Sequence, residues 1–333
     1  MMHRRTAARW CVLVAVAAVS CAAPGQREIV FASASGPIPE PGTVIDIFAM
    51  QPDGSGLRQL THGAGTRRES NSPVWSPDGT QIAYSVVPRT YPVERLSLHV
   101  MDASGDSDRL LVQQDSLDVT YPEWSPDGRR LSFTAFTIDT TGTATSWIYM
   151  VNADGTMLTR LSRSATRSRT ASPIACASWM PDGDTLLMSE AGSPGPSRIL
   201  RIAVPSGDTR LVVESDTLAL LCPVAAPDGS SVLLTAWPSQ GPRSNVGYGM
   251  RIYRMDPDCG GLRPFVELAG FSKNARWSRD GRFVVFHGSD APNFSDLPLS
   301  EVGDSLEIFT TDRSGGNKKQ VTHNSRGDAH PGW

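Results

Sequence analysis

The sequence lacks the familiar catalytic motifs, a long apolar segment and any convincing amphipathic helix. It contains no Gly-x-Ser-x-Gly elbow, no Lys-containing phosphate loop and no His-Glu-x-x-His zinc motif. Its apolar run at 10–19 has ten residues, which are too few to span a bilayer as a helix. These absences indicate a non-enzymatic protein, for which we expect no cofactor and no metal ion.

What is present is the composition of a soluble globular protein rich in turns. Hydrophobic residues make up 39% and charged residues 20% of the chain, with 25 Pro and 30 Gly. A length of 333 residues would suggest about two domains, but closed all-β folds of this size form one.

The first 21 residues have the pattern of a bacterial export signal. Three arginines precede the apolar run, and Ala18-Val19-Ser20-Cys21 resembles a lipobox with Ala18 where Leu is usual. We therefore expect an exported, periplasmic protein that is anchored to a membrane through lipid on Cys21. Residues 22–27 would be a tether of about 20 Å, and 28–333 the folded domain. Removing residues 1–20 leaves 28 Lys plus Arg against 34 Asp plus Glu, a net charge of −6 that argues against nucleic acid.

A Trp-Ser-Pro-Asp-Gly segment recurs along the whole chain. Taking the Trp position as the marker, the copies are 49, 55, 46, 52 and 56 residues apart, which indicates a repeat architecture. The conserved positions of the copies are Trp75, Asp78, Gly79, Trp124, Asp127, Gly128, Trp179, Asp182, Gly183, Asp228, Gly229, Trp277, Asp280, Gly281 and finally Trp333; Ala225 stands at the Trp position of the fifth copy.

Each copy predicts a tight hairpin turn. Pro has the φ that the first central position of a type I turn requires, and Asp is compatible with the second position. Gly adopts the left-handed conformation that follows. Alternating apolar and polar residues on both sides predict strands, four to a unit, which we name A to D in chain order with the Trp at the end of A. The acidic turns at Asp53 and Asp154 lack the twelve-residue calcium loop, so hairpin chemistry explains them better.

The two ends of the chain complete each other. The N-terminal unit has strands B, C and D, while 329–333 form an A strand with nothing after it. We therefore predict an all-β fold, a six-bladed β-propeller of four antiparallel strands per blade, closed by pairing of the N- and C-terminal strands. An open array of β units would leave the ends unexplained. The closed ring is expected to be monomeric.

These repeats resemble those of the TolB-type propeller family, in which Leu-Thr, a variable loop and Pro-x-Trp-Ser-Pro-Asp-Gly follow one another. Here Leu60-Thr61 leads to Pro73-Val74-Trp75-Ser76-Pro77-Asp78-Gly79, and Val321-Thr322 leads to Pro331-Gly332-Trp333. The resemblance covers about 28–333 and implies the propeller fold. It does not settle function, because the same propeller occurs in TolB, beside peptidase domains and in other exported proteins. The α/β domain that precedes the propeller in TolB is missing here.

The long irregular connections predict where a site would be. In this topology the segments at 34–43, 63–72, 163–174, 237–249 and 288–304 lie on one face, and binding usually resides on such loops. Three residues before each Trp position stand Ser72, Tyr121, Cys176, Cys222, Asn274 and His330, which should form a ring around the channel. From these we select Ser72, Tyr121, Asn274 and His330, together with Asp328, as candidate binding residues at the channel mouth.

The cysteines and histidines leave alternatives open. Cys176 and Cys222 occupy equivalent places on neighbouring blades, so we expect their side chains to point the same way and to remain two buried free thiols rather than a disulfide. Cys259 is expected to be exposed and unpaired. His330 lies near His62, His287, His323, Asp290 and Asp328 in the repeat, which would permit a metal site, although solvated histidines explain the pattern equally simply.

The sequence thus favours a binding platform for a cell-envelope protein or a cell-wall-associated partner. One alternative is a propeller that binds carbohydrate or another small ligand, for which Tyr91, Trp237, Tyr248 and Phe294 are the aromatic candidates. The other is a metal-dependent lyase or hydrolase at the channel mouth.

Overall fold

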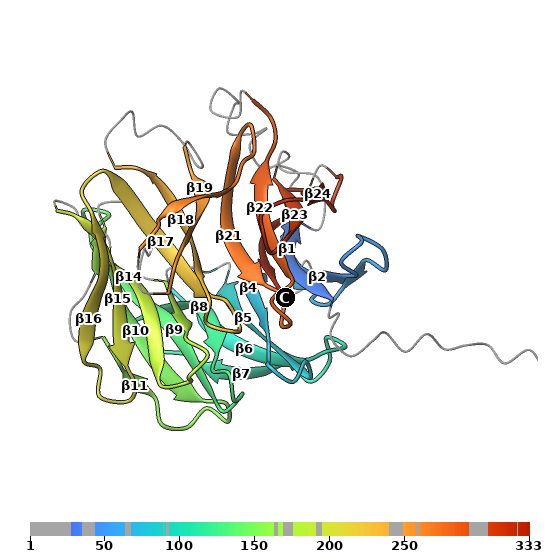
Figure 1. The fold of residues 1–333 in the computed structure, drawn as a ribbon. Coiled ribbons are helices and arrows are strands. Elements are labelled where there is room, and N and C mark those ends of the chain that lie inside the picture. Colours follow the sequence, from blue (N-terminus) through green and yellow to red (C-terminus); the bar gives the residue numbers. More distant parts are fainter. Residues whose placement is uncertain are drawn as a thin grey trace, which may run out of the picture.

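Six four-stranded antiparallel sheets surround a central axis in the computed structural model (Figure 1). The structure describes residues 28–34, 44–63, 68–88, 90, 93–162, 166–168, 176–190, 195–239, 249–257, 260–292, 306–324 and 326–333. All regular elements in these ranges are strands, and among these residues no helix is long and apolar enough to cross a membrane. The predicted export signal, Cys21 and the predicted tether lie outside the described residues.

The blades follow one another along the chain. Blade 1 contains β25 (Ala329–Gly332), β1 (Ile29–Ala34), β2 (Ile45–Met50) and β3 (Arg58–Gln59). Blade 2 contains β4 (Arg68–Trp75), β5 (Gln81–Pro88), β6 (Ser97–Asp102) and β7 (Arg109–Val112). Blade 3 contains β8 (Asp118–Trp124), β9 (Arg130–Ile138), β10 (Ala144–Asn152) and β11 (Thr159–Arg160), with β12 (Thr166–Ser168) also pairing β10.

The other three blades have the same order. Blade 4 contains β13 (Ala177–Trp179), β14 (Thr185–Glu190), β15 (Ser197–Ala203) and β16 (Thr209–Ser215). Blade 5 contains β17 (Leu218–Ala225), β18 (Val232–Pro238), β19 (Arg251–Met255) and β20 (Arg263–Val266). Blade 6 contains β21 (Phe271–Trp277), β22 (Phe283–Ser289), β23 (Glu307–Asp312) and β24 (Lys319–Gln320). The prediction of a six-bladed propeller is confirmed.

The ring is closed by the two ends of the described chain. Strand β25 pairs antiparallel with β1, with Gly332 opposite Val30 and Ala329 opposite Ala32. The C-terminus accordingly lies beside β1 and β4 (Figure 1). Trp333 stacks on Phe283 of blade 6 with ring centroids 6.1 Å apart, so this last marker packs on the neighbouring blade. Closure in this way removes the free edges that an open sheet array would expose.

The repeated turns have the predicted geometry. In blade 2 the Gly79 N–H donates to the Ser76 carbonyl at 2.9 Å, and Gly79 has a φ of 75°, which an L-residue rarely adopts. The Ser76 hydroxyl donates to Asp78 at 2.6 Å and accepts the N–H of Gln81 at 3.0 Å. The acidic turn at Asp53 is a local turn as well, because its carboxylate accepts the N–H and hydroxyl of Ser55.

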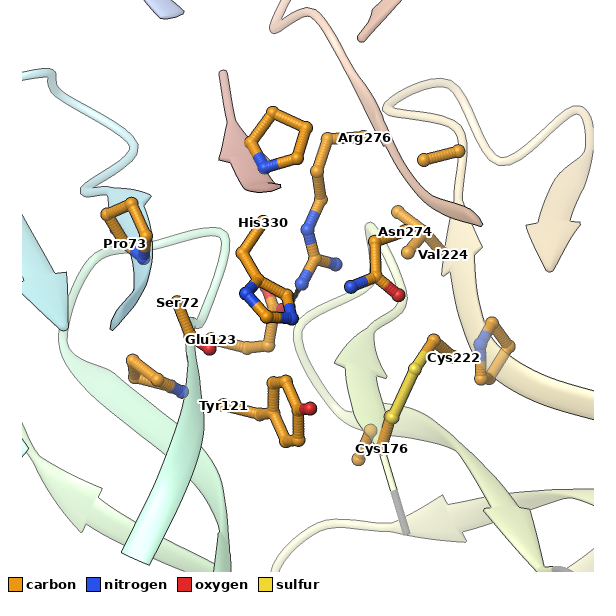
Figure 2. A pocket seen from close by; sticks show the side chains of 15 residues that line it. Ser72, Pro73, Tyr121, Glu123, Cys176, Cys222, Val224, Asn274, Arg276 and His330 are labelled. Atoms are coloured by element: carbon orange, nitrogen blue, oxygen red, sulfur yellow. Dashed lines mark ion pairs between the residues drawn. A yellow bond between two sulfur atoms is a disulfide. The ribbon is translucent and has the colours of Figure 1, made fainter. Parts of the chain in front are cut away.

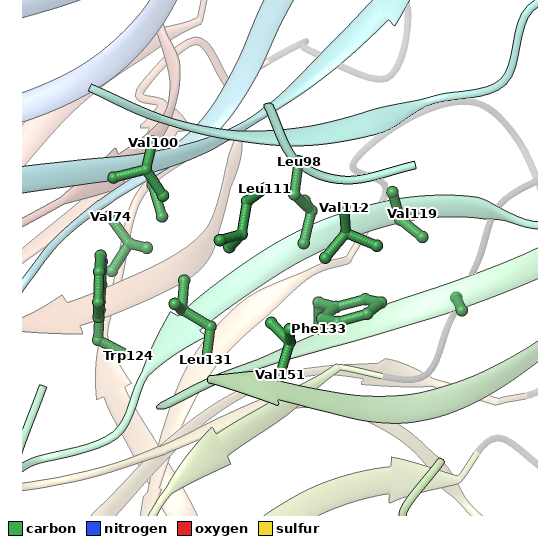
Figure 3. Packing of buried hydrophobic residues seen from close by; sticks show 12 residues of the cluster. Val74, Leu98, Val100, Leu111, Val112, Val119, Trp124, Leu131, Phe133 and Val151 are labelled. Carbon is green, nitrogen blue, oxygen red and sulfur yellow. The ribbon is translucent and has the colours of Figure 1, made fainter. Parts of the chain in front are cut away.

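The core consists of clusters between blades. Figure 3 shows the cluster between blades 2 and 3, where side chains of β6 and β7 meet Trp124, Leu131 and Phe133. The indoles add polar links: Trp75 Nε1 donates to the Glu28 carbonyl at 2.8 Å, and Trp179 Nε1 to the Glu123 carbonyl at 3.1 Å. Each marker Trp therefore fills an apolar seam, and two of them also bond the backbone of the preceding blade.

Candidate functional site

In most blades the innermost strand contains a β-bulge. The bulge includes the residue that stands three positions before the marker Trp position. Pairing between β4 and β5 shifts register between Asn71 and Val74, and the same shift occurs in blades 3, 5 and 6. At these bulges and on β25 the backbone is left-handed, with φ between 49° and 54° at Ser72, Tyr121, Cys222, Asn274 and His330. Non-glycine residues adopt this conformation at an energetic cost, and such positions cluster at functional sites.

The six ring positions converge on one hollow at the centre of the propeller. Ser72, Tyr121, Asn274 and His330 line it together with both ring cysteines, and Figure 2 shows their side chains directed toward a common centre. The enclosed space is about 30 Å³, which is room for about two water molecules. The hollow is therefore too small to hold an organic substrate.

An ion pair crosses this hollow. Glu123 of blade 3 and Arg276 of blade 6 come from blades on opposite sides of the ring, and their side chains pair there (Figure 2). Burial raises the pKa of Glu123, and the charge of Arg276 offsets this only in part. Sequence reasoning missed the pair, although the signal was present: both residues immediately precede a marker Trp, and they stand three blades apart with opposite charge.

The prediction of two free thiols was wrong. Cys176 and Cys222 form a disulfide that joins blades 4 and 5 at the hollow, with their α-carbons 4.8 Å apart. The error lay in expecting equivalent positions to direct their side chains the same way around the ring. Cys222 has a left-handed φ of 49°, and the α-carbon separation is within the range of a disulfide. Cys259 lies outside the described residues.

His287, His330 and Lys273 form a basic cluster where blade 6 meets blade 1. The imidazoles are 5.4 Å apart, and Lys273 stands directly opposite His287 in the pairing of β21 with β22. The N–H of His330 donates to Nδ1 of His287 at 3.3 Å, so neutral His287 carries its hydrogen on Nε2. That buried Nε2 has no partner in the described chain, and neither has Nδ1 of His330.

The environment of this cluster keeps the imidazoles neutral. Burial lowers the pKa of His330 to about 3, with the charges of Lys273 and Arg276 acting in the same direction. Burial, then Lys273 and His330, lower the pKa of His287 too. Burial also lowers the pKa of Lys273, whose ammonium has the Phe271 ring at 5.8 Å and no ion pair with any described residue.

Asp328 does not line the hollow. It is fully buried beneath the inner strand, where its carboxylate accepts from the Asn324 amide at 2.8 Å. Burial raises its pKa, and hydrogen bonds from Ser33, Thr322 and Asn324 offset only part of that effect. Among the described residues, no three His, Cys, Asp or Glu side chains are arranged to hold a metal ion.

Most of the long connections lie outside the described residues, including 35–43, 64–67, 169–175, 240–248 and 293–305. The same holds for Tyr91, Tyr248 and Phe294 of the aromatic set. Trp237 is described, and it is half-buried on β18 opposite Ala219.

Residues 58–246 match the TolB beta propeller domain, which is more than half of the chain. The chain belongs to the TolB β-propeller family. This confirms the family suggested by the repeats. No curated protein matches the sequence.

Solved structures share the fold at low identity. TolB from Acinetobacter baumannii is 17% identical with a TM-score of 0.70, and the match covers 92% of this chain and 66% of that one. A putative TolB from Agrobacterium tumefaciens is 19% identical with a TM-score of 0.56, covering 78% and 96%. An oligogalacturonate lyase in complex with manganese is 15% identical with a TM-score of 0.53, covering 84% and 71%. Because this propeller occurs both in TolB and in an enzyme, the likeness shows the fold and not the activity.

Proposed function

We propose that this chain is a non-enzymatic binding platform of the cell envelope that recognises a protein partner at the mouth of its central channel. It is exported to the periplasm, is held at a membrane by lipid on Cys21 and acts as a monomer. The family supports the proposal, since the chain shares its propeller with TolB proteins.

The observation that carries the proposal is the narrowness of the central hollow among the described residues. The Glu123–Arg276 ion pair and the Cys176–Cys222 disulfide meet at a hollow of about 30 Å³. A cavity of about 150 Å³ holds a molecule as small as benzene. A ligand therefore has no chamber to enter here, and recognition takes place on the surface around the channel.

The charges next to the hollow indicate what the partner presents. Glu123 is already paired with Arg276, while Lys273 has no anionic partner in the described chain. A partially buried ammonium without a counter-ion is stabilised by any carboxylate brought to it. The partner therefore offers an acidic side chain or its C-terminal carboxylate to Lys273.

Site-directed photocrosslinking in the native envelope tests this assignment. A photoreactive residue at Ser72 probes the channel, and one at Thr156, in an exposed turn of blade 3, probes the opposite face. We expect one protein to be captured from Ser72 and not from Thr156, and to be lost when Lys273→Met removes the charge. Equal capture from both faces, or none from Ser72, would overturn the proposal.

The lipid anchor has its own test. Cys21→Ser should abolish incorporation of labelled fatty acid and move the protein from the membrane to the soluble periplasmic fraction. Labelled fatty acid that persists in the variant, or wild-type protein without any, would contradict the anchor and leave the binding assignment standing.

A further inference from the structure

A second pocket lies in blade 2 and shares no residue with the central hollow. It has a volume of about 140 Å³ and is formed by the ends of β4 and β5, the segment before β6, and strands β6 and β7. A cavity of about 150 Å³ holds a molecule the size of benzene. By this comparison the pocket has room for a small ligand of about the size of benzene.

Two opposite charges line this pocket without neutralising each other. Arg68 and Glu94 both contribute to its wall, and neither makes a hydrogen bond or ion pair with any described residue. The charge of Arg68 helps to lower the pKa of Asp108. Left separate, Arg68 and Glu94 offer one place for a carboxylate and another for an ammonium group in the same pocket.

Arg95, a third charged residue of the pocket wall, is held by an ion pair with a buried carboxylate. The Arg95 guanidinium contacts the Asp118 carboxylate at 3.2 Å, and that carboxylate is fully buried. Asp118 also accepts the N–H of Leu96 at 3.0 Å, which fixes the backbone next to Arg95. A guanidinium positioned in this way is a preorganised donor for a carboxylate.

The floor of the pocket is a buried histidine held by a carboxylate. His99 is 6% exposed, and its Nδ1 lies 2.9 Å from Asp108, which also accepts the Tyr84 hydroxyl at 2.8 Å. Burial opposes the ionisation of Asp108, but hydrogen bonds from His99 and Tyr84 outweigh it and lower its pKa. With Nδ1 occupied, Nε2 is the nitrogen left for a ligand.

The remaining wall is apolar. Val86 and Pro88 come from β5, and Leu110 of β7, at 52% exposure, is one of the most exposed large apolar side chains of the described chain. An aliphatic group in the pocket would cover Leu110 and remove its apolar surface from water.

We propose that this pocket binds a free aliphatic α-amino acid. Arg68 and Arg95 take the carboxylate, Glu94 takes the ammonium group, and the side chain packs on Val86 and Leu110. The site goes beyond the platform function and does not depend on it, since it shares no residue with the channel.

Ligand-observed NMR and calorimetry on the purified full-length protein test the proposal with valine as the probe. Isovalerate is valine without the ammonium group, and isobutylamine is valine without the carboxylate. We expect valine to bind with millimolar affinity and each analogue to bind at least about tenfold more weakly, because each loses one charged contact. Binding of isovalerate or isobutylamine as tight as that of valine would overturn the proposal, as would no detectable valine binding.

Two substitutions locate the site. Arg68→Gln and Glu94→Gln should each weaken valine binding about tenfold while the unfolding transition stays unchanged, because both side chains are exposed and unpaired in the described structure. Arg160→Gln and Glu267→Gln remove the same charges from exposed positions in blades 3 and 5 and should leave binding unchanged. Equal losses in the two pairs of variants would mean that valine binding does not depend on this pocket, which contradicts the site.

Discussion

The repeated turns of blades 3 and 5 have the same backbone and different side-chain bonds. In blade 3 the Gly128 N–H donates to the Ser125 carbonyl at 2.8 Å, and in blade 5 the Gly229 N–H donates to the Ala226 carbonyl at 2.8 Å. In blade 3 the Ser125 hydroxyl donates to Asp127 at 2.6 Å and accepts the N–H of Arg130 at 2.9 Å. Blade 5 has no hydroxyl at this place.

In blade 5 the Asp of the turn accepts the Ser230 N–H at 3.0 Å and also bonds the neighbouring blade. Asp228 pairs with Arg313 of blade 6 at 2.5 Å, and the Arg313 guanidinium also lies 6.0 Å from the Trp277 ring. The Asp of the repeat bonds its own turn in both blades, and in blade 5 it joins two blades as well. Asp-Gly is common to all the turns, since blade 6 forms the same turn with Arg279 in place of Pro, whereas the Trp and Ser before it supply stability that another contact can replace.

The largest effect in this comparison should come from the marker Trp. Trp75→Ala should lower the free energy of unfolding by about 3–5 kcal/mol, because a buried indole is lost and the Glu28 carbonyl loses its donor. Urea denaturation followed by circular dichroism measures it. Blade 5 has Ala225 at the position that corresponds to Trp75. There Ala225 packs in one apolar cluster with Met180 and Tyr253. A loss below about 1 kcal/mol in Trp75→Ala would mean that the indole is dispensable in blade 2 as well.

Removing the buried hydroxyl should have the next largest effect. Ser125→Ala should cost about 1–3 kcal/mol, since Ser125 is fully buried and the Arg130 N–H would lose its acceptor. Ser104→Ala is the matched control, because the Ser104 hydroxyl bonds Asp102 in an exposed turn. Equal losses in the two variants, measured by the same urea titration, would show that burial of the turn hydroxyl is unimportant.

The blade 5 ion pair should contribute less than about 1 kcal/mol, because both partners are well exposed. The bond from Arg313 lowers the pKa of Asp228 to about 2, with hydrogen bonds from Ser230 adding to it. A carboxyl with a depressed folded pKa stabilises the fold above its unfolded pKa and loses that contribution as the pH falls. The melting temperatures of wild type and Asp228→Asn should therefore differ at pH 6 and converge between pH 4 and 2. A gap that is constant over this range would contradict the assignment.

Restoring the missing hydroxyl should have the smallest effect. In Ala226→Ser the new hydroxyl would bond Asp228 and compete with Arg313, so the gain and the loss should nearly cancel, to within about 0.5 kcal/mol. A double-mutant cycle with Arg313→Met measures the coupling. A coupling energy of Asp228 with Arg313 that is unchanged by Ala226→Ser would show that the two bonds do not compete.

The sequence predicted what depends on local chemistry and on the repeat. Pro-Asp-Gly at regular steps determines the turns, and the unpaired B-C-D unit at one end requires the A strand at 329–332, which is how β25 pairs with β1. The equivalence of the repeats also predicted a ring of residues around the channel. Four of these residues line one hollow in the structure: Ser72, Tyr121, Asn274 and His330.

Predictions from the equivalence of repeat positions were wrong where the surroundings of a single residue differ from blade to blade. Cys176 and Cys222 stand at equivalent positions of neighbouring blades, yet their side chains meet and form a disulfide. Asp328 is adjacent in sequence to the inner strand but is turned beneath it, where Asn324 holds it. The pocket at Arg68 and Glu94 depends on side chains from four separate segments, which no periodic pattern relates.

The pairing of β25 with β1 also has a consequence for how the protein is made. Residues 329–332 lie about 300 positions from the strand they pair with, so the first blade lacks its innermost strand until the end of the chain has been delivered. Contacts this distant in sequence form slowly, because the intervening loop must close first. The ring therefore cannot close before the last residues of the A strand at 329–332 have been synthesised.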